Sequence, residues 1–131
     1  MAWILLCVDG SPGSKRTAKM ARDMALSFSS QVLVLHVLPV TPGSPRPSEN
    51  ELEPVFHVPI EILQAGRVMY ETKVLIGNPS EMILETANDE NHPFSLIVIG
   101  AKGARCSEAP YIGSVARELL QHSNVPVIVV P

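Results

Sequence analysis

Long apolar runs, an excess of basic charge and a cysteine framework are all missing from this 131-residue sequence. The formal net charge is −3, which argues against a nucleic-acid-binding protein, because affinity for a phosphate backbone depends on clustered Lys and Arg. No apolar stretch approaches the roughly 20 residues that span a bilayer. The apolar start at residues 3–8 has neither a charged leader nor a cleavage site. We therefore expect a cytoplasmic protein that binds neither a membrane nor nucleic acid.

Cysteine is scarce: only Cys7 and Cys106 are present, and their positions fit no metal-binding spacing. A disulfide framework is unnecessary at this length, because chains of roughly 100 to 150 residues bury a sufficient core. We therefore expect one domain over residues 1–131, with Cys7 as a small core residue.

Two phosphate-handling motifs of enzymes are also absent. The sequence contains no Gly-Lys-Ser/Thr phosphate loop and no Ser-Gly-Gly-x-Asp-Ser pattern of the ATP pyrophosphatases. The four histidines have no paired spacing with an acid or a nucleophile that would define a general base. We therefore predict no catalytic residues and no metal ligands, and we expect a binding protein rather than an enzyme.

Apolar runs of strand length are present, and most of them alternate with amphipathic segments of helix length. The runs lie at residues 3–8, 31–38, 70–76, 96–99 and 127–130. Residues with helical spacing run from Ser11-Pro12 to residue 29, from Asn78-Pro79 to about residue 88, and over residues 114–123. At the first two of these helices, Ser11 and Asn78 are expected to be the N-caps, with Pro12 and Pro79 at the first helical position. This alternation predicts an α/β fold with a parallel sheet and helices on both faces.

The second connection of this alternation is unusual. Residues 41–59 contain five prolines, and a proline inside a helix removes a hydrogen bond and clashes with the preceding turn. We therefore expect an extended loop there, followed at most by a short helix from Pro59 to a stop at Gly66. The second helix is thus predicted to be shortened or replaced by a proline-rich loop.

A glycine-bearing loop at residues 100–114 joins the fourth apolar run to the last helix. Glycines allow main-chain N–H groups to approach an anion, and a helix start adds unpaired donors. Many α/β proteins have such turns without a ligand, so the residues alone leave phosphate binding and a plain turn equally open. Asp9, Gly10 and Ser11 follow the first strand in the same way. If the two strands are neighbours, both loops border one crevice at the carboxyl ends of the strands.

The spacing Gly100-x2-Gly103-x9-Gly113-Ser114 resembles the nucleotide-binding signature of the universal stress protein family, ATP-binding type. Further landmarks look like that family in the same order along nearly the whole chain. They are residues 4–11, residues 35–37, the helix entry at Gly77-Asn78-Pro79, residues 96–100 and residues 126–130.

The resemblance implies a Rossmann-like five-stranded parallel sheet of order 3-2-1-4-5. It also implies binding of ATP, together with a divalent ion such as Mg²⁺, in a stress-response or signalling role. Asp9 would contact the nucleoside end, the main chain of Val37 would face adenine, and Gly113 would help to hold the phosphates. The residues that match the family's site are Val8, Asp9, Gly10, Ser11, Val37, Ile99, Gly100, Gly103, Gly113, Ser114 and Val115. The family also implies a homodimer formed through Val127–Val130.

Three features depart from the family pattern. The first is the replacement of the family's long second helix by the proline-rich loop expected at residues 41–59. The spacer at residues 104–112 carries Glu108 and Pro110, and a negative charge near phosphates opposes binding. Ser95 replaces the acid that commonly starts the fourth strand. Two alternatives therefore stay open beside ATP binding: a dimeric interaction module of the same family that binds no nucleotide, and a slow ATP hydrolase.

Overall fold

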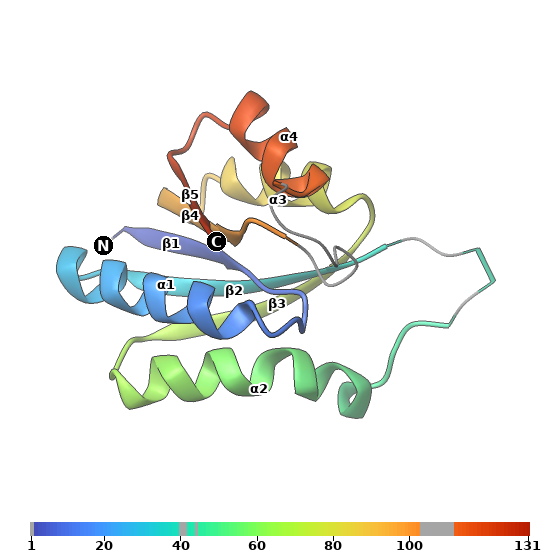
Figure 1. The fold of residues 1–131 in the computed structure, drawn as a ribbon, viewed down its shortest axis with the longest axis horizontal. Coiled ribbons are helices and arrows are strands. Elements are labelled where there is room, and N and C mark those ends of the chain that lie inside the picture. The colour runs from blue at the N-terminus through green and yellow to red at the C-terminus, as the bar shows by residue number, and fades with distance from the viewer. Residues whose placement is uncertain (1, 40–41, 44, 103–111) are drawn as a thin grey trace.

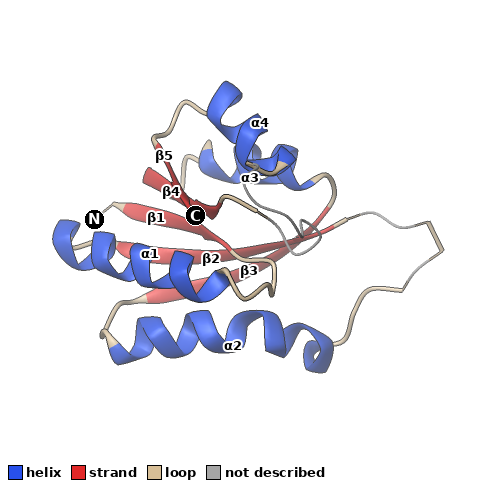
Figure 2. Ribbon diagram, in the orientation of Figure 1, coloured by secondary structure: helices blue, strands red, loops and turns tan. Residues whose placement is uncertain are grey.

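The computed structural model describes residues 2–39, 42–43, 45–102 and 112–131, so Gly103 and most of the 104–112 spacer lie outside the described residues. Strands and helices alternate along these ranges (Figure 2). The elements are β1 (Trp3–Cys7), α1 (Ser14–Phe28), β2 (Gln31–Leu38), α2 (Glu49–Ala65), β3 (Tyr70–Ile76), α3 (Pro79–Ala87), β4 (Phe94–Gly100), α4 (Ser114–His122) and β5 (Val127–Val130).

All five strands form one parallel sheet of order β3-β2-β1-β4-β5. Helices α1 and α2 cover one face of the sheet, and α3 and α4 cover the other (Figure 1). The predicted α/β class and strand order are therefore confirmed. β1 lies at the centre, between β2 and β4. The chain leaves β1 toward α1 on one face and leaves the neighbouring β4 toward α4 on the other face, so the two connections diverge at adjacent strand ends.

The core consists of two apolar layers, one on each face of the sheet. Ile4 and Leu6 of β1 point into the layer beneath α1 and α2, whereas Leu5 points into the layer beneath α3 and α4. β1 is buried along its whole length because both of its faces are covered, which explains its continuous apolar sequence. On α1, the stripe of Ala18, Ala21 and Ala25 is small enough for the helix to lie close against the strands.

The prediction of an extended loop over residues 41–59 is wrong from Glu49 onward, because α2 is a 17-residue helix that contains both Pro54 and Pro59. The predicted helix stop at Gly66 is confirmed, since Gly66 is the C-cap of α2. Each interior proline costs about 3 kcal/mol. A fully buried large apolar side chain contributes about 1.5–3 kcal/mol. Phe56, Pro59 and Leu63 are buried in the layer beneath α2, with further partly buried apolar side chains beside them. Tertiary packing of this stripe therefore offsets the local penalty, and the second helix is neither shortened nor replaced.

Two helices are expected from the sequence to begin with a capping residue followed by proline, and the structure confirms this start for only one of them. At α3 the prediction is confirmed: Pro79 opens the helix, and the side chain of Asn78 accepts a hydrogen bond from the Glu81 N–H at 3.1 Å. At α1 the helix begins at Ser14 and the N-cap is Gly13, so Ser11 is not the cap. The Ser11 carbonyl instead accepts the Ser14 N–H at 3.0 Å. The segment from Asp9 to Gly13 is therefore a loop at the carboxyl edge of the sheet.

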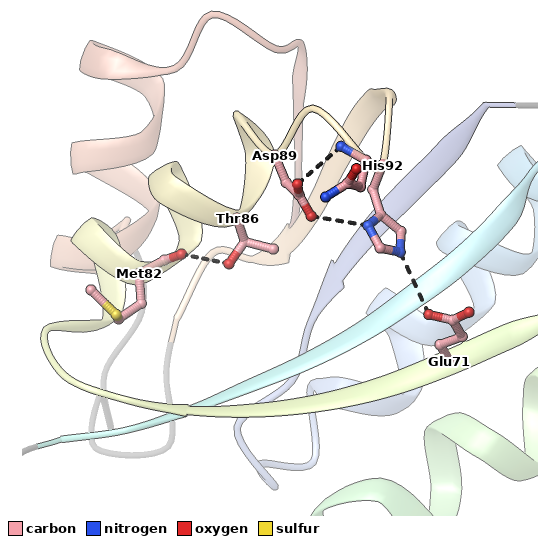
Figure 3. Close-up of polar contacts among 6 residues, drawn as sticks. Glu71, Met82, Thr86, Asp89 and His92 are labelled. Atoms are coloured by element: carbon pink, nitrogen blue, oxygen red, sulfur yellow. Dashed lines mark hydrogen bonds and ion pairs between the residues drawn. The ribbon is translucent and has the colours of Figure 1, made fainter.

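A polar cluster ties the α3–β4 connection to the edge strand β3 at the opposite end of the sheet (Figure 3). His92 lies 3.0 Å from Asp89 through Nδ1 and 3.6 Å from Glu71 through Nε2. Hydrogen bonds from the Asn91 N–H and from His92 hold the pKa of Asp89 below its usual value. This cluster fixes the turn that leads into β4 and lies far along the strands from the glycine loop.

Candidate functional site

A pocket of about 1150 Å³ lies at the carboxyl ends of β1, β2 and β4. The β1–α1 loop forms one wall, and the first turns of α3 and α4 form another. Cys7, Leu35, Val37 and Ile99 supply an apolar floor from three neighbouring strands. This is the position where ligands bind in doubly wound sheets, because the loops separate there.

Most of the predicted site residues line this pocket. They are Val8, Asp9, Ser11, Val37, Ile99, Gly100, Gly113, Ser114 and Val115. Gly10 does not line it, and Gly103 lies outside the described residues. The structure therefore brings together residues that are up to about a hundred positions apart in the sequence, on one side of one sheet.

Asp9 organises the β1–α1 loop. Its Oδ1 accepts hydrogen bonds from the Ser11 N–H at 2.9 Å and from the Ser14 hydroxyl at 3.4 Å. Gly10 follows with a φ of +81°, a conformation that glycine adopts readily, and a Cβ there would lie 3.4 Å from a methyl group of Val55 on α2. Gly10 therefore shapes the loop by packing against α2, outside the pocket, while Asp9 stays at the pocket wall.

The start of α4 supplies main-chain donors on the other side. Gly113 is the N-cap, and its N–H donates to the Ala101 carbonyl. Because glycine has no side chain, the N-cap residue itself does not occupy the free N–H groups of the first turn. The N–H groups of the first turn of a helix have no partner within the helix, and the positive end of the helix dipole adds to their attraction for an anion. Ser114 opens the helix and lines the pocket.

The charges around the pocket are mixed. Lys102, in the glycine-bearing loop, lines the pocket, and Asp9, Glu81 and Glu118 line other parts of its wall. Glu118 pairs with His122 at 3.5 Å. Within the described ranges, no group of three or more His, Cys, Asp or Glu side chains is arranged to hold a metal ion.

Several pocket residues are not predicted from the sequence. Cys7 has the sequence context of a core residue, and His36, a single polar residue in an apolar strand, has no acid or nucleophile at paired spacing that would mark it as a site residue. The wall from Asn78 to Leu84 was identified only as a helix start. Its place beside the pocket depends on α3 packing against α4, which no local pattern reveals.

The arrangement suits a ligand with a flat apolar part and an anionic end. The apolar floor between β1, β2 and β4 can hold an aromatic ring, and a carboxylate at Asp9 can accept hydrogen bonds from hydroxyl groups. The start of α4 can receive an anion. The described residues contain no helix with the length and apolar character needed to cross a bilayer.

The fold and the pocket at the point where the connections diverge define a doubly wound α/β protein with a pocket at its switch point. A family model described as the universal stress protein family matches residues 2–131. The chain therefore belongs to the universal stress protein family.

Individual relatives agree with this assignment. The chain is 31% identical over 134 residues to a universal stress protein of Thermus aquaticus, named for the 3′ region of QAH/OAS sulfhydrylase, with 97% of this chain and 96% of the relative covered. A universal stress protein of Archaeoglobus fulgidus, solved in complex with dAMP, has a TM-score of 0.76 at 24% identity and covers 100% of this chain and 98% of its own. A universal stress protein solved in complex with cAMP has a TM-score of 0.76 at 18% identity, with 99% and 97% covered.

Proposed function

We propose that this protein binds an adenine nucleotide, ATP with Mg²⁺, in the pocket and acts through its bound state in a stress-response or signalling role in the cytoplasm. The observation that carries the proposal is the placement of Asp9 and of the start of α4, with glycine as its N-cap, in the walls of a single pocket with an apolar floor. The dAMP and cAMP complexes of two structural neighbours support an adenine nucleotide as the ligand class.

Each part of the nucleotide would find a matching group. Adenine would lie on the floor against Ile99 and the main chain of Val37, and the ribose hydroxyls would donate to Asp9. The phosphates would accept hydrogen bonds from Gly113, Ser114 and Val115 at the start of α4. Gly100 and Gly103 would allow the phosphate chain to pass close to the main chain.

A divalent ion would arrive with the phosphates, because no described cluster is arranged to hold one alone. Mg²⁺ prefers oxygen ligands and is commonly bound through phosphates and few protein groups. Ser114 lines the pocket, and its hydroxyl has the chemistry that such a ligand requires. When bound, the ion would neutralise part of the phosphate charge.

Substitutions of Gly113 test most directly whether the phosphates bind at the start of α4. Its φ of −65° and ψ of 163° are extended values that any residue adopts, so a side chain there does not strain the backbone. We expect Gly113→Val to weaken the affinity for ATP at least about 100-fold by filling the phosphate path, while Gly113→Ala has a much smaller effect. Isothermal titration calorimetry on both variants and the wild type measures the dissociation constants, and matched thermal unfolding curves check the fold. Absence of wild-type binding at millimolar ATP would overturn the proposal.

A homodimer through Val127–Val130 is proposed as the assembly. β5 is an edge strand of apolar sequence, and an unpaired apolar edge is a template for pairing with another chain. The same observation favours the second candidate function, an interaction module that works by dimerisation without nucleotide. Nucleotide titration separates the two, since only the first function requires binding.

A further inference from the structure

The main-chain hydrogen bonds between β1 and β2 stop one bond before the point where a regular parallel ladder could still continue. Its register runs from Trp3 opposite Gln31 to Cys7 opposite Leu35, and the Val8 N–H then donates to the Leu35 carbonyl at 2.9 Å. In a parallel ladder the next bond would run from the Val37 N–H to the Val8 carbonyl. That carbonyl is instead occupied by the side chain of His36, whose Nδ1 lies 2.8 Å from it.

The direction of the Val37 main chain follows from its neighbours. Alternate residues of a parallel strand direct their N–H and C=O groups to opposite neighbouring strands. Val32 and Leu38 bond on the β3 side, through the Val32 N–H to Met69 and the Leu38 carbonyl to Gly77, whereas Leu35 bonds to β1. Val37 lies two residues after Leu35 in the same strand, so its N–H and C=O groups point to the β1 side as well. β1 has ended there, and Val37 lines the pocket.

The His36 ring is fixed by its hydrogen bond to the Val8 carbonyl and by an aromatic contact with α2. A carbonyl oxygen can only accept a hydrogen bond, so Nδ1 of His36 carries the proton. Phe56 of α2 meets the ring edge to face, with centroids 6.3 Å apart and an interplanar angle of 86°. Phe56 is itself only 9% exposed, so α2 fixes the orientation of the imidazole.

We propose that His36 is a positioning residue that keeps the β1–β2 ladder open by one step and so reserves the N–H and C=O groups of Val37 for the base of the ligand. This inference rests on the proposed function of the pocket. Adenine presents an acceptor, N1, beside the donor of its 6-amino group, which complements one N–H and one C=O group. Hypoxanthine presents a donor at N1 beside an acceptor at O6. Its N1–H would face the N–H group of Val37 and its O6 the C=O group, so neither hydrogen bond could form.

The test compares ATP with inosine triphosphate on three forms of the protein. His36→Asn keeps an amide donor near the position of Nδ1, whereas His36→Gln moves its amide one bond further along the side chain. We expect the wild type and His36→Asn to prefer ATP about tenfold or more, and His36→Gln to lose about tenfold in ATP affinity with little change for the inosine nucleotide. A Gln variant that retains the full preference would overturn the role of His36.

Hydrogen exchange of the Val37 amide gives a readout that needs no nucleotide. We expect this amide to exchange fast in the free wild-type protein and more slowly in His36→Gln, where it can donate to the released Val8 carbonyl. Slow exchange in the wild type, or no slowing in a folded His36→Gln variant, would contradict the proposal. If the wild type binds no nucleotide at all, the proposed function fails, while the exchange experiment still decides what His36 does.

Discussion

Cys7 occupies the floor of the pocket at the end of β1 and is 9% exposed. Burial raises the pKa of its thiol from 9.0 to about 12. The thiolate is the reactive form of cysteine, so this side chain is a neutral part of the apolar floor. The expectation that Cys7 is a core residue is therefore confirmed, although its place in the pocket was not foreseen.

The first prediction concerns the reactivity of Cys7. In a Cys106→Ala background, where Cys7 is the only thiol, alkylation by iodoacetamide at pH 8 should be at least about 100-fold slower in the native protein than in urea, because burial suppresses the thiolate and blocks access. Mass spectrometry of timed samples measures both rates. Comparable rates would show that Cys7 is accessible and ionised in the folded chain.

The second prediction concerns stability at alkaline pH. The folded pKa of Cys7 is raised above the unfolded value of 9.0, so its contribution to stability is complete below about pH 9 and is lost as the pH rises toward 12. The free energy of unfolding of the wild type should therefore fall more steeply between pH 9 and pH 11 than that of Cys7→Ala. Urea titrations across this range measure the difference, and parallel pH curves for the two proteins would argue against a buried, protonated thiol.

At the scale of elements, α2 shows where local sequence patterns fail. The strands and the Asn78-capped α3 could be predicted because their signals lie within a few residues. α2 could not, since two interior prolines argue against a helix and only the tertiary burial of Phe56 and Leu63 reverses the balance. The bond from His36 to Val8 spans 28 residues, and it too depends on which strands become neighbours.

The third prediction separates the two prolines of α2. Pro54 is exposed, so Pro54→Ala should stabilise the protein by about 1–3 kcal/mol by restoring a helical N–H without loss of packing. Pro59 is fully buried, so Pro59→Ala gains the same hydrogen bond but leaves a void in the layer beneath α2. In urea unfolding, Pro54→Ala should therefore have a larger free energy of unfolding than both the wild type and Pro59→Ala. A destabilised Pro54→Ala would mean that the ring of Pro54 makes a contribution of its own.

The whole molecule has polar residues on one sheet edge and an apolar strand on the other. β3 exposes Glu71, Thr72 and Lys73, and charged side chains on an edge discourage pairing with another chain. β5 consists of Val and Ile alone. The asymmetry favours β5 as the surface that a second copy of the chain would cover.

The fourth prediction tests this pairing through the direction of the β5 main chain. The carbonyls of Pro126 and Val130 accept hydrogen bonds from Ile97 in β4 and from Ala101 just after it. The alternate residues of β5, including Val129, therefore direct their N–H and C=O groups to the free edge. Val129→Pro should therefore remove an edge donor and convert a dimer to a monomer, while Ile128→Pro should disrupt the sheet itself. Light scattering after gel filtration measures the mass, and a monomeric wild type at micromolar concentration would exclude the dimer.

Nucleotide binding is the central claim, and a titration of ¹⁵N-labelled protein with ATP and Mg²⁺ tests it most directly. We predict saturable shifts of the amide signals of Val37, Gly100 and Ser114, with the signals of Glu71 and His92 at the opposite end of the sheet unchanged. Invariant spectra at millimolar ATP, or shifts confined to residues outside the pocket, would contradict the account.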